Sequence, residues 1–191
     1  MIKFLKNLSK YYTQIIQIVL INSFQALQMT DKDISINLSA IDIELETIRD
    51  EIFVLLEKYK ADTHRVVFEL LEDENVKDLS VIHSFISEVK KYGVKIAIDD
   101  FGSGYSNFER LLEYQPDILK IDGSLIKNIQ DDVYSLSIVK TIVSFAKEQN
   151  LQIVAEFVEN EAIYNILNHL GIDFSQGYYF ARPKPLEEES K

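Results

Sequence analysis

The chain has 191 residues, a formal net charge of −11 and no cysteine. This length suffices for one sizeable hydrophobic core, and the absence of cysteine excludes disulfides, thiolate metal ligands and a thiol nucleophile. The acidic balance argues against binding of a nucleic-acid polymer, because proteins that bind phosphate backbones carry an excess of Lys and Arg. The apolar run at 15–21 is too short to cross a bilayer. We therefore expect no membrane span and a cytoplasmic location, either as a separate protein or as the cytoplasmic part of a larger membrane-anchored one.

Helix-like and strand-like segments alternate along the chain. Apolar residues at helical spacing predict helices, and short apolar runs predict strands. The helices are expected over 2–27 with a break at 7–10, and over 43–59, 76–92, 108–114, 133–148 and 161–170. The strands are expected at 34–38, 65–70, 94–99, 118–121, 152–156 and 175–180. Gly93 and Gly171 stand where glycine commonly ends a helix.

This alternation predicts an α/β fold whose parallel strands are joined by crossover helices. The chain contains neither a GxGxxG nor a GxxxxGK motif, which favours a (β/α)8 barrel over a nucleotide-binding doubly wound sheet. Six of the eight strands of such a barrel are predicted, and the chain opens directly on a helix. We therefore expect a barrel domain over 1–186 that is truncated at the N-terminus and lacks its first strand, followed by a charged tail at 187–191.

The most informative stretch is IAIDDFGSGYS at 96–106, in which an apolar strand ends on Asp99 and Asp100 and a glycine-rich turn follows. Two adjacent carboxylates repel each other unless protons or cations neutralise them. They could both reach one site only where the strand ends, because neighbours within a strand point to opposite faces. Taken alone, the pair also fits a helix N-cap or a salt bridge in a loop.

Five of the predicted strands place a polar side chain opposite the apolar face. Each lies near the C-terminal end of its strand, where barrel enzymes carry their catalytic groups. If the apolar faces meet the outer helices, these side chains point into the barrel, where charges persist only when they are paired or bound to metal. The structural alternative is a salt-bridged polar plug, in which the acidic side chains surround Lys120 without binding a metal ion. The five residues are Asn37, Glu69, Asp99, Lys120 and Glu156.

The candidate ligands in this set, together with Asp100, are all oxygen donors. The histidines are expected at the surface instead: His64, His83 and His169. Oxygen ligands select Mg²⁺, Mn²⁺ or Ca²⁺ over Zn²⁺ or Cu²⁺. The acids suffice for two cations with Asp99 between them, an arrangement that hydrolyses phosphodiesters by in-line displacement. Lys120 would then hold the attacking water or the developing charge, and Glu156 would order or deprotonate that water.

Six motifs in this order and spacing make the chain resemble the EAL domain of bacterial cyclic di-GMP phosphodiesterases: INLSA, FELLEDE, IDDFGSGYS, LKIDGSLI, VAEFVEN and SQGYYFARP. The resemblance covers nearly the whole chain. It implies a (β/α)8 barrel that hydrolyses cyclic di-GMP to linear pGpG with two Mg²⁺ or Mn²⁺ ions. It also implies a homodimer contact through the loop at 101–108, or sensor or GGDEF-type domains on the same parent chain.

The resemblance also implies a role for individual residues of this sequence. The implied metal ligands are Asn37, Glu69, Asp99 and Asp100. The implied catalytic residues are Lys120 and Glu156, which act on the attacking water, and Glu72, which steadies the loop after the Asp99–Asp100 pair. The implied substrate-binding residues are Asp122, Gln176 and Glu159.

The chain departs from this family in three places. The Glu-Ala-Leu motif, which names the family and supplies a metal ligand, does not precede Asn37, so either a fragment of a longer signalling protein or a degenerate domain is possible. Phe157 replaces the glycine of the EGVE motif, and Leu71 replaces the threonine of ELTE. Two functional hypotheses follow: a phosphodiesterase, or a module that binds cyclic di-GMP or a protein partner without hydrolysis. Without the Glu-Ala-Leu ligand, we expect negligible turnover from residues 1–191 alone.

Overall fold

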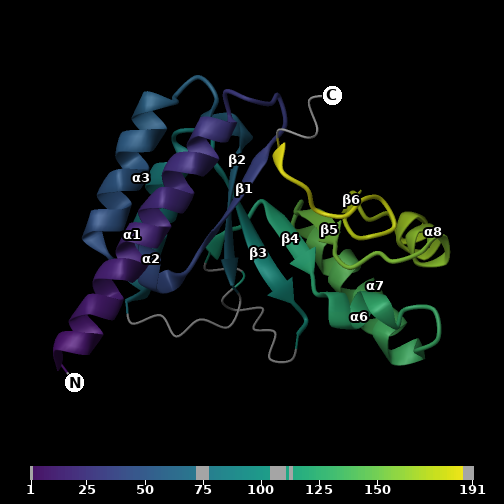
Figure 1. Cartoon of the computed structure of the whole chain (residues 1–191). Coiled ribbons are helices and arrows are strands. Elements are labelled where there is room, and N and C mark those ends of the chain that lie inside the picture. Colours follow the sequence, from purple (N-terminus) through teal and green to yellow (C-terminus); the bar gives the residue numbers. More distant parts are fainter. Residues whose placement is uncertain (1, 72–77, 104–110, 112–113, 187–191) are drawn as a thin grey trace. The chain divides into compact units, whose positions relative to one another are not determined.

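The computed structural model describes residues 2–71, 78–103, 111 and 114–186, with side chains from residue 11 onward (Figure 1). The strands are β1 (Ile34–Leu38), β2 (Val66–Leu71), β3 (Lys95–Phe101), β4 (Ile118–Ile121), β5 (Gln152–Ala155) and β6 (Phe174–Ser175). The helices are α1 (Ile2–Ala26), α2 (Ala40–Glu44), α3 (Glu46–Lys58), η1 (Thr63–Arg65), α4 (Leu79–Lys90), α6 (Gly123–Lys127), α7 (Val133–Glu148) and α8 (Glu161–Leu170). Hydrogen-bonded neighbours in the sheet follow the chain order, β1-β2-β3-β4-β5-β6. The predicted parallel pairing is confirmed for β1 with β2, β4 with β5, and β5 with β6.

The chain divides into two compact units, one formed by 1–97 and 108–116 and the other by 98–107 and 117–191. In the first unit, α1, α3 and α4 each bury an apolar face whose residues recur at helical spacing. Phe24 of α1, Ile52 of α3 and Val89 of α4 are fully buried. The rings of Phe68 on β2 and Phe85 on α4 stack with their centroids 6.0 Å apart. Buried aromatic and aliphatic side chains therefore join the helices of this unit to its sheet.

In the second unit, polar side chains define where the helices begin. Asp132 accepts hydrogen bonds from the backbone N–H groups of Tyr134 and Ser135 at the start of α7, and Asn160 accepts one from Ile163 at the start of α8. Such caps satisfy backbone donors that have no partner within the helix. Gly171 ends α8 in the left-handed conformation with φ +74°, as its position predicts.

The structure corrects two predicted helices and adds a third that was not predicted. No break occurs at 7–10, because α1 runs continuously over Ile2–Ala26. The helix expected over 43–59 is instead two helices, which meet at Leu45 where the backbone is extended with ψ 110°. The short helix α6 was not predicted, because five residues carry too little periodicity to distinguish a helix from a loop.

The last predicted strand, at 175–180, is wrong in extent. β6 covers Phe174–Ser175 alone, and the chain then turns. Tyr179 donates its backbone N–H to Val158, and Phe180 donates to Gly177 across the turn. The aromatic run has high strand propensity, but these tertiary contacts override it.

Several expectations concern residues that are wholly or partly outside the described ranges. These are Glu72, most of the helix expected over 108–114, most of the loop at 101–108 and the tail at 187–191. None of the helices described by the structure combines the length and the apolar character needed to cross a bilayer.

Candidate functional site

Three charged side chains meet in the second unit at the ends of neighbouring strands. Lys120 Nζ on β4 lies 2.7 Å from Asp99 Oδ1 on β3 and 2.8 Å from Glu156 Oε1, which follows β5. The side chains of Lys120 and Glu156 are 7% and 9% exposed. The juxtaposition expected from strand parity is therefore observed for these three residues. One lysine faces two carboxylates at a place where water provides little screening.

Gln176 also holds Glu156, at the same carboxylate oxygen that Lys120 contacts. The side-chain amide of Gln176 donates a hydrogen bond of 2.8 Å to Glu156 Oε1, and the backbone N–H of Gln176 donates to the carbonyl of Ala155. Burial raises the pKa of Glu156 above its usual range; Lys120 opposes that rise, and the charges of Asp99 and Asp100 add to it. The carboxylate is thus both oriented and made a stronger base than an exposed glutamate.

Asp100 adopts the left-handed backbone conformation with φ +54°, and its N–H donates to Asp99 Oδ1 at 3.1 Å. This turn lets both acids approach the same place, which an extended strand would prevent. Burial raises the pKa of Asp100, and the negative charges of Asp99 and Asp122 raise it further. The site thus carries more negative charge than Lys120 alone offsets.

Asp100→Asn should therefore make the metal-free protein more stable at pH 7. A carboxyl whose pKa is raised by folding contributes stability below its unfolded pKa, about 3.9, and loses that contribution as the pH rises through the folded pKa. The advantage of the variant should accordingly grow from about pH 4 upward. Urea unfolding in chelator at pH 4 and pH 7 measures the difference in stability between the variant and the original chain. An equal stability of the two proteins at pH 7 would contradict this account.

A divalent cation fits this acidic cluster. Asp99, Asp100 and Glu156 each offer a carboxylate oxygen, and these oxygens lie within 4.8 Å of one another. Hard cations such as Mg²⁺ and Mn²⁺ prefer oxygen ligands. The three histidines are exposed, as predicted, and take no part in this cluster.

The other two predicted ligands lie in the first unit. Asn37 on β1 and Glu69 on β2 are register partners in the parallel pair. Glu69 is 9% exposed, whereas Asn37 is exposed. The pairing places both side chains on one face near the C-terminal ends of their strands, as their parity predicts.

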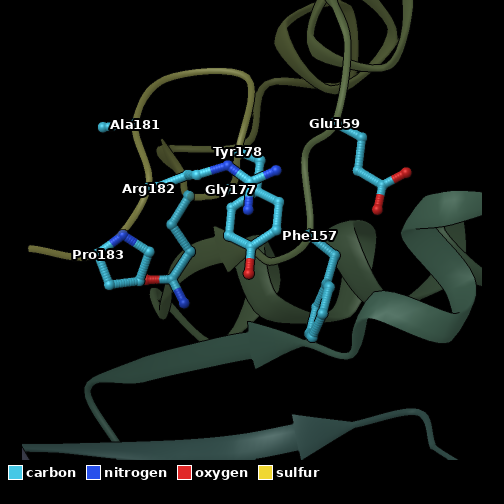
Figure 2. A pocket seen from close by; sticks show the side chains of 8 residues that line it. Phe157, Glu159, Gly177, Tyr178, Ala181, Arg182 and Pro183 are labelled. Atoms are coloured by element: carbon cyan, nitrogen blue, oxygen red, sulfur yellow. The ribbon is translucent and has the colours of Figure 1, made fainter.

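The predicted substrate-binding residues lie in the second unit, as the acidic cluster does. Asp122 caps α6 by accepting the N–H of Ser124 at 3.0 Å, and its own N–H donates to the carbonyl of Phe101. Gln176 and Glu159 line a pocket of about 490 Å³ (Figure 2). Gln176 thus belongs to both the acidic cluster and the pocket.

Figure 2 shows that the pocket is built from two segments, 157–159 and 176–183. Its aromatic and cationic groups are Phe157, Tyr178 and Arg182, and the guanidinium of Arg182 lies 4.4 Å from the centroid of the Tyr178 ring. Tyr178 and Arg182 were not among the predicted site residues. The available signal was the aromatic run at 178–180 and Arg182 shortly after Gln176, in a chain with a large acidic excess.

Comparisons with known proteins agree with this arrangement. A family model described as EAL domain matches residues 3–183. The chain is 37% identical over 154 residues to the probable cyclic di-GMP phosphodiesterase PdeA of Escherichia coli K12. The aligned region covers 81% of this chain and 21% of that protein. The chain spans about a fifth of the length of the curated relatives it matches.

Solved structures show the same fold. The cyclic di-GMP complex of the PaMucR phosphodiesterase superposes with a TM-score of 0.85 at 30% identity, covering 97% of this chain and 77% of that one. The calcium/cyclic di-GMP complex of Klebsiella pneumoniae BlrP1 gives a TM-score of 0.77 at 26% identity. The match covers 88% of this chain and 43% of that one. This likeness confirms the predicted parallel α/β fold of the barrel class. With a family match over nearly its whole length, the chain belongs to the EAL domain family.

Proposed function

We propose that the chain is a phosphodiesterase module that hydrolyses cyclic di-GMP to linear pGpG. The observation that carries this proposal is the buried Lys120 between Asp99 and Glu156, with Asp100 adjoining and a nucleotide-sized pocket beside them. The names of the relatives support the substrate, since they are cyclic di-GMP phosphodiesterases. In the reaction the oxygen of a water bonds to one phosphorus, one phosphorus–oxygen bond of the ring breaks, and the leaving ribose oxygen takes up a proton.

Each residue has a defined part in this proposal. Mg²⁺ or Mn²⁺, held by Asn37, Glu69, Asp99 and Asp100, would lower the pKa of the attacking water and offset charge on the phosphate. Glu156 accepts the proton of that water, and its raised pKa suits a base that works near neutral pH. Lys120 stabilises the charge that develops at the phosphate. Gln176 keeps Glu156 in position, and Asp122, Glu159 and Gln176 contact the nucleotide.

A module that binds cyclic di-GMP without hydrolysis is the second candidate, favoured by the bulky Phe157 directly after Glu156. The test compares the chain with the same chain carrying a Glu-Ala-Leu strand fused ahead of Met1. Each is incubated with Mn²⁺ and cyclic di-GMP, and chromatography detects pGpG. We expect turnover from the fused chain. Binding without turnover in both supports the second candidate, and the absence of both binding and turnover refutes the two together.

Hydrolysis by the fused chain should require Mg²⁺ or Mn²⁺ and should be inhibited by Ca²⁺. The all-oxygen ligand set binds each of these ions, but Ca²⁺ is larger and accepts looser coordination, which misplaces the reacting water. The measurement is the rate of pGpG formation in chelator and after addition of each ion. Undiminished hydrolysis in excess chelator would exclude the metal site.

We further propose a cytoplasmic location and a homodimer, or covalent linkage to a GGDEF-type or sensor domain. One relative, MucR of Pseudomonas aeruginosa, is named as a bifunctional diguanylate cyclase and phosphodiesterase. Light scattering of the purified chain, with and without cyclic di-GMP, tests the dimer.

A further inference from the structure

Phe157, which directly follows Glu156, has an unusual backbone conformation. Its φ is +53°, in the left-handed region that glycine adopts freely and a bulky side chain adopts at a cost of order 1–3 kcal/mol. The family motif carries glycine at this position, as the resemblance above indicates. A phenylalanine that keeps a glycine-like conformation retains its ring at an energetic cost, which favours a function for the ring.

The ring of Phe157 is held in place by α6. An added Cβ at Gly123 would lie 2.2 Å from Phe157 Cδ2, so the ring occupies the space directly over this glycine. Lys127 Nζ lies 4.4 Å from the centroid of the Phe157 ring, a favourable cation–π distance. These two contacts fix the ring without enclosing it, since Phe157 remains 49% exposed.

The exposed part of the ring lines the pocket shared with Glu159, Tyr178 and Arg182 (Figure 2). The volume, about 490 Å³, lies within the range of pockets for drug-sized ligands. An aromatic wall offers a flat apolar surface, the guanidinium of Arg182 suits a phosphate, and the carboxylate of Glu159 can accept N–H groups from a base edge. Together these groups match a purine nucleotide, which is one half of cyclic di-GMP.

We propose that Phe157 is a ligand-binding residue of this chain, on whose ring one guanine base of cyclic di-GMP stacks. The proposal rests on the proposed function, because it assigns a contact to the same substrate. Stacking on an aromatic side chain is a substantial source of affinity for nucleobases. Phe157 would thereby add binding that a glycine at this position cannot supply.

The test uses the 191-residue chain in Ca²⁺, with cyclic di-GMP titrated and the dissociation constant measured by calorimetry. Phe157→Gly and Phe157→Leu should each weaken binding about tenfold, within the range for loss of one base–aromatic stack, and Phe157→Trp should bind at least as tightly as the original chain. Phe174→Leu is the matched control, because Phe174 is similarly exposed at 55% but does not line the pocket. Thermal unfolding establishes that each variant is folded.

A spectroscopic arm reports stacking directly, because the chain contains no tryptophan. In Phe157→Trp the single indole should be quenched on addition of cyclic di-GMP, whereas in Phe174→Trp it should not. Unchanged affinity in Phe157→Gly, or affinity retained in Phe157→Leu, would overturn the stacking role while leaving the proposed function intact. If neither the original chain nor the chain with the fused Glu-Ala-Leu strand binds cyclic di-GMP, the proposed function and the stacking role both fail.

Discussion

Asp99→Asn should reduce the hydrolysis of cyclic di-GMP by more than about 10²-fold, which exceeds the usual loss when a residue that only supports a metal ligand is changed. Asp99 ends β3 within 2.7 Å of Lys120 and within reach of both other carboxylates of the cluster. In the proposed site it lies between two cations, so the amide would weaken both at once. The measurement is kcat/KM for pGpG formation with Mn²⁺ in the chain that carries the fused Glu-Ala-Leu strand.

Two variants serve as controls for Asp99→Asn. Glu72→Gln changes a residue with a proposed supporting role and should cost much less activity. Asp131→Asn changes an exposed aspartate between α6 and α7 and should cost none. Comparable activity in Asp99→Asn and Glu72→Gln, with both proteins folded, would show that Asp99 does not hold the metal ions.

Lys120→Met should destabilise the metal-free protein by about 3–5 kcal/mol, the range for removing one partner from a buried ion pair. The lysine is 6% exposed and is paired with both Asp99 and Glu156, so its removal leaves carboxylates that are buried without a countercharge. Methionine fills a volume similar to that of lysine, so the variant loses the positive charge without leaving a cavity. The measurement is urea unfolding at pH 7 in chelator.

Addition of Mn²⁺ should restore much of that stability, because a bound cation replaces the missing charge. Lys91→Met is the control: its ion pair with Glu88 is solvent-exposed, and such pairs contribute about 1 kcal/mol or less. The same experiment separates a metal site from a salt-bridged polar plug. If Mn²⁺ stabilises neither the original chain nor Lys120→Met, the cluster is a plug and the metal assignment is wrong.

Strand parity was sufficient to predict that Asp99, Lys120 and Glu156 would meet. Lys120 and Asp99 alternate with buried apolar neighbours such as Leu119 and Ile98, and a period of two determines the face on which each side chain lies. The parallel strands then bring their C-terminal ends to one edge. The face of each side chain depends only on the local pattern of apolar and polar residues, so it can be predicted from a single sequence.

The pocket could not be predicted in the same way. The aromatic run at 178–180 reads as a strand, but backbone contacts of Gly177 and Tyr179 with Val158 turn it into a wall of the pocket. The position of the Phe157 ring depends on Gly123, which is distant in sequence and lies in a helix too short to be recognised from the sequence. Contacts between residues far apart in the chain determine the shape of the pocket, and such contacts leave no periodic signal in the sequence.

The packing of Phe157 on Gly123 also limits the order in which mutations can accumulate. An alanine at position 123 would place its Cβ 2.2 Å from Phe157 Cδ2 and 2.9 Å from Phe157 Cβ, so rotation of the ring alone cannot relieve the clash. A lineage that carries phenylalanine at 157 must therefore keep glycine at 123. Reversion of Phe157 to glycine removes this restriction, so the same substitution at 123 is harmful in one background and tolerated in the other.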